Sequence, residues 1–140
     1  MKDVSILMPV FAQVALTFAL LFWMAKERVG AMRAGTVIST GKDQKPGWPA
    51  QAAKVSDSFH NQFQMPVLFF AVVAFALIAD KADDTMVMLA WAFVAARVAQ
   101  ALVHTTYNRI IPDRFLAFLV GNFVLLAMWV RLYLAVSSAG

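Results

Sequence analysis

The chain has 140 residues, of which 61% are hydrophobic, and its formal net charge at pH 7 is +4. A water-soluble domain of this length could not bury so much apolar surface, so a lipid bilayer must be part of its solvent. The absence of cysteine excludes disulfides, thiolate catalysis by the chain itself and cysteine-ligated metals.

Four apolar segments follow one another along the chain, over residues 4–25, 59–79, 85–106 and 115–136. Each has about the 20 residues that a helix needs to cross about 30 Å of hydrocarbon. The first is too long for the core of a signal peptide, and no small-x-small cleavage site follows it. We therefore predict an all-α integral membrane protein in which residues 1–140 form one domain, a bundle of four transmembrane helices.

The connections between these segments differ in length. The second, "DKADD", and the third, "YNRIIPDR", are short, which predicts that consecutive helices are antiparallel. The first connection, residues 26–58, contains "AGTVISTGKDQKPGWPAQAA", whose glycine, proline and polar residues predict an irregular loop.

Basic residues in the connections predict the orientation. Residues 26–58 and 107–114 contain eight of them, whereas the other side has two; these are Lys26, Arg28, Arg33, Lys42, Lys45, Lys54, Arg109 and Arg114 against Lys2 and Lys81. Basic residues gather on the cytoplasmic side of membrane proteins. We therefore expect a multi-pass protein of the inner or plasma membrane with a cytoplasmic 26–58 loop and both termini non-cytoplasmic. This bias also accounts for the positive charge without a nucleic-acid partner.

The second segment, "FHNQFQMPVLFFAVVAFALIA", begins with a polar cluster at its cytoplasmic edge. Residues three or four apart share a helix face, so Asn61 and Gln64 form one polar stripe. Arg97, Gln100 and His104 form another on the third segment, which runs in the opposite direction. The two stripes therefore meet at one level within the cytoplasmic half of the bundle.

Each polar residue of these stripes has a structural and a functional interpretation. Amide and histidine side chains in spans often only bridge neighbouring helices. Arg97 points more strongly to a site, because a guanidinium inside a span is costly without a partner or water. Arg131 lies near the outer end of the last segment, where snorkelling would suffice.

Further arginines are expected near the mouth of this region, namely Arg28 and Arg33 after the first segment and Arg114 before the fourth. The resulting cluster is cationic and rich in amides, which suits an anionic, hydrogen-bonding ligand. His60 and His104 lack a carboxylate or a third ligand beside them, so we expect no metal site.

The segments "NQFQMPVLFF" and "WAFVAARVAQALVHTTYNRIIPDRFLAF" resemble the membrane-associated proteins in eicosanoid and glutathione metabolism, the MAPEG family. The likeness covers essentially the whole chain. It implies a homotrimer with glutathione bound between subunits near the cytoplasmic face, and a glutathione transferase, peroxidase or eicosanoid synthase activity.

The resemblance implies roles for individual residues. Arg114 matches the arginine that stabilises the glutathione thiolate, and would be catalytic. Six residues would bind glutathione: Arg28, Asn61, Gln64, Arg97, Gln100 and His104. Gln64 stands where the family has a glutamate, and Gln100 and His104 replace its ring and phenol residues. A glutamine supplies no counter-charge for the glutathione ammonium, so binding weaker by about 1–3 kcal/mol is expected.

Two functions follow from this pattern. The first is a glutathione-dependent transferase or peroxidase that acts on lipophilic electrophiles arriving from the bilayer. The alternative is a non-catalytic protein of the same fold that binds membrane lipid or serves as an accessory subunit of a larger membrane complex. A proton-coupled exporter would need a carboxylate within a span, and none of the four segments has one in its interior.

Overall fold

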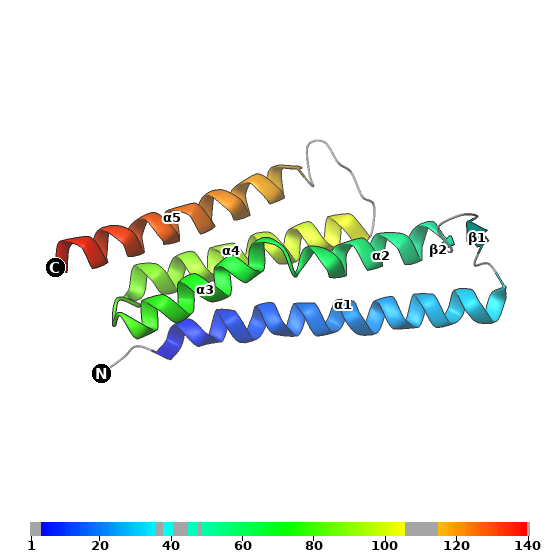
Figure 1. The fold of residues 1–140 in the computed structure, drawn as a ribbon, viewed down its shortest axis with the longest axis horizontal. Coiled ribbons are helices and arrows are strands. Elements are labelled where there is room, and N and C mark those ends of the chain that lie inside the picture. The colour runs from blue at the N-terminus through cyan, green and yellow to red at the C-terminus, as the bar shows by residue number, and fades with distance from the viewer. Residues whose placement is uncertain (1–3, 36–37, 41–44, 48, 106–114, 140) are drawn as a thin grey trace.

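The computed structural model describes residues 4–35, 38–40, 45–47, 49–105 and 115–139. In chain order, the elements are a 3-10 turn η1 (Val4–Ile6), helix α1 (Leu7–Ala34), strands β1 (Ile38–Thr40) and β2 (Lys45–Gly47), and helices α2 (Ala50–Asn61), α3 (Met65–Ile78), α4 (Asp84–Thr105) and α5 (Phe115–Ala139) (Figure 1).

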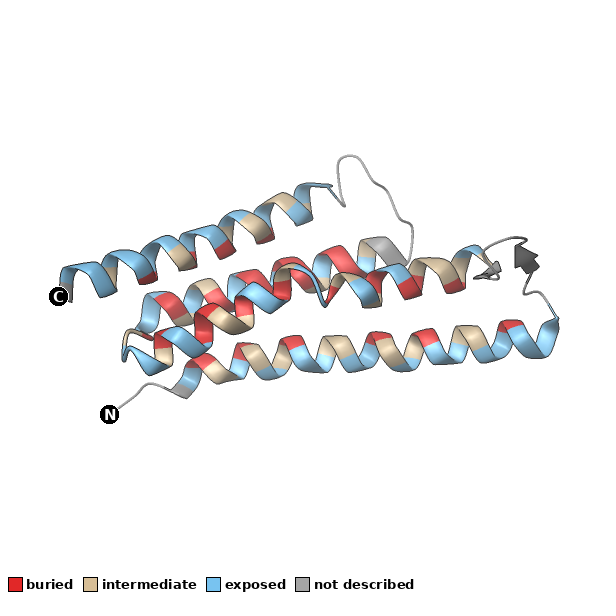
Figure 2. Cartoon of the chain, viewed as in Figure 1, coloured by how far each residue is buried: buried red, intermediate tan, exposed pale blue. Residues whose placement is uncertain are grey.

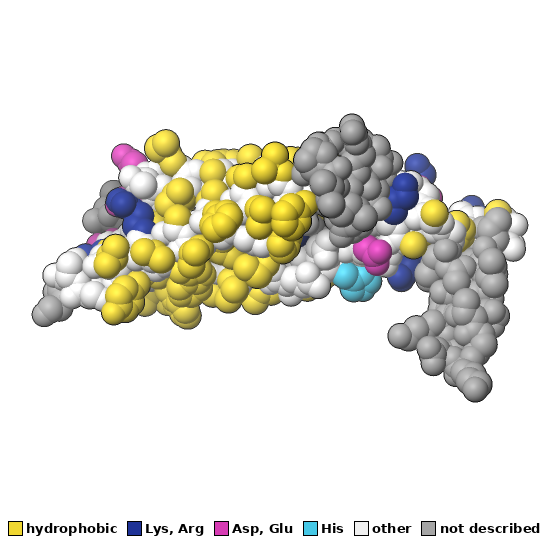
Figure 3. Space-filling model, turned by 90° about the horizontal axis from the view of Figure 1, so that it is seen from above, with side chains coloured by type: hydrophobic (Ala, Val, Ile, Leu, Met, Phe, Trp, Pro, Cys, Tyr) yellow, Lys and Arg dark blue, Asp and Glu magenta, His cyan; other side chains and the backbone are white. Residues whose placement is uncertain are grey.

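The prediction of four membrane helices is confirmed. Four helical stretches are long and apolar enough to cross a bilayer: Leu7–Ala34, Ala50–Ile78, Asp84–Val103 and Phe115–Ser138. They alternate in direction, so that η1, the turn between α3 and α4 and the C-terminal end of α5 lie at the same end of the bundle (Figure 1). Hydrophobic side chains cover the middle of the molecule, whereas charged side chains lie towards its two ends (Figure 3).

The connection predicted over residues 26–58 is shorter than expected. Helix α1 continues to Ala34 and α2 already begins at Ala50, so helix occupies both ends of this segment. With 28 residues, α1 is about 42 Å long, which exceeds the hydrocarbon thickness of about 30 Å. Its C-terminal turns and α2 pack together beyond the span (Figure 1). The buried face of α2 gives these turns their packing partner, which the local sequence pattern did not reveal.

Gly35 ends α1. Its φ of 68° is left-handed, and its backbone N–H donates to the carbonyl oxygens of Ala31 and Met32. Glycine adopts this conformation without steric cost, which explains why the helix stops here. Beyond it, β1 and β2 pair antiparallel with Ile38 opposite Gly47 and Thr40 opposite Lys45.

The apolar core lies where α3, α4 and α5 meet η1 and the start of α1. Phe69 of α3 stacks on Phe93 of α4 with ring centroids 4.6 Å apart, and both side chains are fully buried. The buried residues of α1, α3 and α4 face one another, whereas much of α5 is exposed (Figure 2). Helix α5 packs mainly on α4, and its outer apolar face is available to lipid or to a second protein chain.

Asp83 connects the start of α4 to α5. Its Oδ1 accepts a hydrogen bond of 2.9 Å from the backbone N–H of Met86, as the N-cap of α4, and its Oδ2 forms a 2.7 Å ion pair with Nη2 of Arg131. Arg131 is exposed, as its place near the outer end of the last segment predicts, and it also has a carboxylate partner because the turn after α3 brings Asp83 within its reach.

Candidate functional site

The second membrane stretch is interrupted between α2 and α3, at Gln62, Phe63 and Gln64. Pro66, at the start of α3, has no N–H to donate to the carbonyl of Gln62, and its ring would clash with that carbonyl in a continuous helix. The chain instead tightens, with Phe63 N–H donating to His60 O at 3.0 Å and Gln64 N–H to Asn61 O at 3.3 Å. The interruption leaves backbone carbonyls at the end of α2 available to side chains of other helices.

Arg97 of α4 uses one of these carbonyls. Its Nη2 donates to the backbone oxygen of Asn61 at 3.1 Å, and its Nη1 donates to Oε1 of Gln100 at 2.8 Å. Only 4% of Arg97 is exposed, and its Nε has no hydrogen-bond partner among the described residues. The guanidinium is therefore held by two neutral acceptors and keeps its positive charge, and Nη1 and Nη2 each keep a second N–H.

A pocket of about 390 Å³ lies beside this guanidinium. Its polar lining comes from both sides of the interruption and from α4, and its remaining walls are apolar; the lining residues are Asn61, Gln64, Met65, Arg97, Gln100, Phe115 and Phe118. Arg97 is the one charged residue in this lining, so within the described part of the chain the pocket is cationic. Such a pocket favours an anionic ligand that can also accept hydrogen bonds.

Four of the seven predicted site residues thus meet in one pocket: Asn61, Gln64, Arg97 and Gln100. The sequence pattern had placed Gln64 on the same continuous helix as Asn61. It lies instead past the interruption, just before α3, and nevertheless reaches the pocket.

Of the other three predicted residues, the structure places the side chain of Arg28 alone. Arg28 does not line this pocket within one chain, because its Nη2 donates to Oγ of Ser56 at 2.9 Å across the contact between α1 and α2. The side chain of His104, at the end of α4, and all of Arg114 lie outside the described residues. Arg33, the alternative to Arg28, is exposed in the last turn of α1.

A second polar contact, which the sequence pattern did not single out, adjoins the pocket. Gln13 of α1 is fully buried, and its Nε2 donates to Oε1 of Gln62 at 2.7 Å. The Nε2 of Gln62 in turn donates to the backbone oxygen of Ser58 at 2.9 Å. This contact ties α1 to the interruption next to Asn61. The one sequence signal was a single glutamine within the apolar stretch "PVFAQVALTF".

No curated protein and no solved structure matches the chain at a significant level. The profile of the MAPEG family, by contrast, matches residues 6–134, which is most of the chain and includes every residue of the pocket. The chain is therefore a member of the MAPEG family.

Proposed function

We propose that this protein is a membrane-bound glutathione-dependent transferase or peroxidase acting on lipophilic electrophiles. The observation that carries the proposal is the buried guanidinium of Arg97 beside a pocket that Asn61, Gln64 and Gln100 also line. Membership of the MAPEG family supports the same class of chemistry. A chain without cysteine needs its thiol from a bound molecule, and glutathione would supply one.

The residues of the pocket fit the anionic part of glutathione. A glutathione carboxylate in the pocket would face the Arg97 guanidinium, whose Nη1 and Nη2 are already oriented by Gln100 and Asn61 and each keep a second N–H. A donor that is held in place before the ligand arrives loses little freedom on binding. Among the described residues of the lining, the glutathione ammonium finds no carboxylate; the neutral amide of Gln64 can accept a hydrogen bond from it but supplies no counter-charge.

The apolar part of the pocket suits a lipophilic second substrate. Phe115 and Phe118, from the start of α5, line one side of it, and both are exposed at the surface of the single chain. An electrophile dissolved in the bilayer could therefore approach between these rings without crossing water. Arg114, next to Phe115 in the sequence, would stabilise the thiolate by its positive charge.

We further propose that the active form is a homotrimer with glutathione between subunits, close to the cytoplasmic face of the inner or plasma membrane. The pocket is open at the surface of one chain, and Arg28 lines no part of it there. Both observations accord with a site that a neighbouring subunit completes. The excess of basic residues in the two connections at this end supports the cytoplasmic orientation.

The proposal is tested by calorimetric titration of the purified protein in detergent with glutathione, while the ultraviolet absorbance of the thiolate is recorded. We expect saturable heat and a thiolate signal at neutral pH. S-methylglutathione, which has no ionisable thiol, is the control and should bind without the absorbance change. Absence of binding at millimolar glutathione would exclude the proposal.

The alternative is a non-catalytic protein with the same fold, serving as a lipid-binding or accessory subunit. The observation that favours it is that two nitrogens of Arg97 are already bonded within the chain, as expected of a residue that only holds α2 and α4 together. On this alternative, Arg97→Ala would impair assembly of the protein, whereas glutathione would have no effect on its melting temperature.

A further inference from the structure

A second cavity, of about 980 Å³, lies at the opposite end of the bundle from the Arg97 pocket. The turn between α3 and α4 forms one side of it and the C-terminal half of α5 the other. One end of its lining is charged, with Asp80, Lys81 and the Asp83–Arg131 pair. The rest is mostly apolar, including Leu89, Val130 and Leu134.

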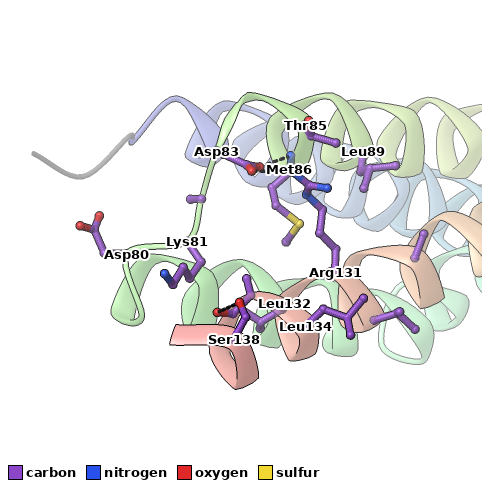
Figure 4. Close-up of a pocket in the computed structure, with 14 residues that line it drawn as sticks. Asp80, Lys81, Asp83, Thr85, Met86, Leu89, Arg131, Leu132, Leu134 and Ser138 are labelled. Carbon is purple, nitrogen blue, oxygen red and sulfur yellow. Dashed lines mark hydrogen bonds and ion pairs between the residues drawn. The ribbon is translucent and has the colours of Figure 1, made fainter. Parts of the chain in front are cut away.

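The charged residues at one end of the cavity are separated in space from apolar residues of its lining such as Leu89. Figure 4 shows Asp80 and Lys81 on one side of the Asp83–Arg131 pair and Leu89 on the other. Along α5, the lining extends from Ala127 to Ser138, a distance of about 16 Å. Helices α4 and α5 are both long and apolar enough to span a membrane. Asp80, Lys81 and Asp83 lie in the turn that leads into α4, and Arg131 of α5 lies at the level of this turn because it pairs with Asp83. The cavity therefore begins at the level of the lipid headgroups and continues into the hydrocarbon region.

The charged end has fixed geometry. Lys81 is half-buried, and its backbone N–H donates to Ala76 O at 2.8 Å in the turn that closes α3. Asp80, just before it, has a φ of 59°, a left-handed conformation that aspartate tolerates better than most residues. The Arg131 guanidinium is held at 2.7 Å from Asp83. The backbone of Asp80 and Lys81 and the side chains of the Asp83–Arg131 pair are thus held in place before a ligand arrives.

The balance of charge selects among phospholipids. Lys81 and Arg131 offer two positive charges, and Asp80 and Asp83 offer two negative ones, so these four lining residues sum to zero. A zwitterionic headgroup matches this arrangement, with its phosphate towards the cations and its ammonium towards a carboxylate. An anionic headgroup without an ammonium would occupy Lys81 and offer no counter-charge to the carboxylate of Asp80.

The lining also distinguishes between two zwitterionic headgroups, phosphocholine with its quaternary ammonium and phosphoethanolamine with its primary ammonium. A quaternary ammonium is bound chiefly by aromatic rings, and no aromatic residue is present among the described residues of this lining. A primary ammonium has three N–H donors, which carboxylates such as that of Asp80 accept. We propose that this cavity binds one phospholipid with a phosphoethanolamine headgroup, whose phosphate contacts Lys81 and whose acyl chain lies along Leu89, Ala127 and Val130. This site is separate from the Arg97 pocket and does not depend on the proposed function.

The experiment is native mass spectrometry of the full chain in detergent, titrated with dioleoyl phosphatidylethanolamine, phosphatidylcholine or phosphatidylglycerol. The unaltered protein should bind the first about tenfold more tightly than either of the others, as expected for a charge-assisted hydrogen bond. Equal binding of the three lipids overturns the proposal. This comparison needs no variant, so it does not depend on how a variant folds.

Two variants test the headgroup and the chain separately. Lys81→Gln should lower the affinity for phosphatidylethanolamine about tenfold, whereas Lys26→Gln, an exposed lysine at the far end of the bundle, should not. Ala127→Trp, which fills the apolar part of the cavity, should abolish binding, whereas Ala15→Trp on the exposed face of α1 should not. Circular dichroism and gel filtration establish that each variant is folded. Unchanged lipid affinity in folded Lys81→Gln, or a second copy of the chain occupying the cavity in an assembled structure, would refute the proposal.

Discussion

Arg97 donates a hydrogen bond of 3.1 Å to the backbone carbonyl of Asn61, although the two residues are 36 positions apart in the chain. The carbonyl is accessible because α2 ends at Asn61. In a continuous helix, the backbone N–H four residues later in the chain would have donated to it. The contact therefore joins a charged side chain of one span to the irregular backbone of another. In a membrane, such a backbone needs partners from within the protein.

The first prediction concerns the planar guanidinium of Arg97, whose two terminal nitrogens contact different acceptors. In Arg97→Lys, a compact ammonium replaces the planar guanidinium, whose separate nitrogens contact Gln100 and Asn61, so it cannot keep this geometry and also face a ligand. We expect glutathione affinity to fall by about 1.5–3 kcal/mol, the contribution of a hydrogen bond to a charged group. Calorimetry measures this change. Arg131→Lys, at the opposite end of the bundle, is the control, and an equal loss in both variants would show that the effect is not local.

The second prediction concerns the absent carboxylate. Gln64→Glu places a negative charge where the glutathione ammonium would lie, and should tighten binding by about 1–3 kcal/mol. Gln51→Glu, in the first turn of α2 and outside the pocket, should leave the dissociation constant unchanged. Weaker binding to Gln64→Glu would mean that the ligand presents an anionic group at this position.

The hydrophobic segments were sufficient to predict the four spans, because a bilayer imposes a length and an apolar composition on each helix. They could not predict how far helix extends beyond the membrane. Helix α1 continues through charged residues to Ala34 because α2 packs against it, and that contact depends on residues well apart in the sequence. Likewise, the pair between Asp83 and Arg131 joins positions 48 apart, which no local pattern indicates.

The sequence predicts how deep each site residue lies in the membrane, and residues at the same depth on neighbouring helices can be in contact. Asn61 and Arg97 lie at matching levels on antiparallel helices, and they do meet. The depth of a residue does not show, however, in which direction its side chain points around the helix axis. For that reason the sequence did not show that Gln13 faces Gln62, nor that Arg28 turns towards Ser56 and away from the pocket.

A third prediction concerns Pro66, which we hold responsible for the interruption between α2 and α3. In Pro66→Ala, the N–H of residue 66 is restored, and the helix can continue through Gln62 and Gln64. Hydrogen exchange across residues 59–66 should slow, and the carbonyl of Asn61 should become less available to Arg97. Pro9→Ala is the control, because a proline in the first turn of α1 removes no helical hydrogen bond. Unchanged exchange in Pro66→Ala would show that other contacts maintain the interruption.

A fourth prediction concerns the buried amide contact between Gln13 and Gln62. Replacing either residue alone by leucine leaves a polar group of its partner buried without this bond, at a cost of about 1–3 kcal/mol. Replacing both should cost less than the sum of the single changes, by about 1 kcal/mol. Reversible denaturation of the four proteins in mixed micelles measures this double-mutant cycle. Strict additivity would mean that the two amides do not stabilise each other.

The last prediction concerns pH. The Arg131 guanidinium and the Met86 N–H hold the pKa of Asp83 below its ordinary value of 3.8. Because the folded state binds this proton less readily than the unfolded state, the contribution of Asp83 to stability is complete above about pH 4 and is lost as the pH falls through the lowered pKa. The melting temperature of the unaltered protein should therefore exceed that of Asp83→Asn at neutral pH, and the difference should shrink in acid. Asp57→Asn, an exposed aspartate of α2, controls for the loss of a surface charge. Because asparagine can keep the N-cap bond to Met86, a difference in melting temperature that stays constant from neutral to acidic pH would show that the charge of Asp83 does not stabilise the fold.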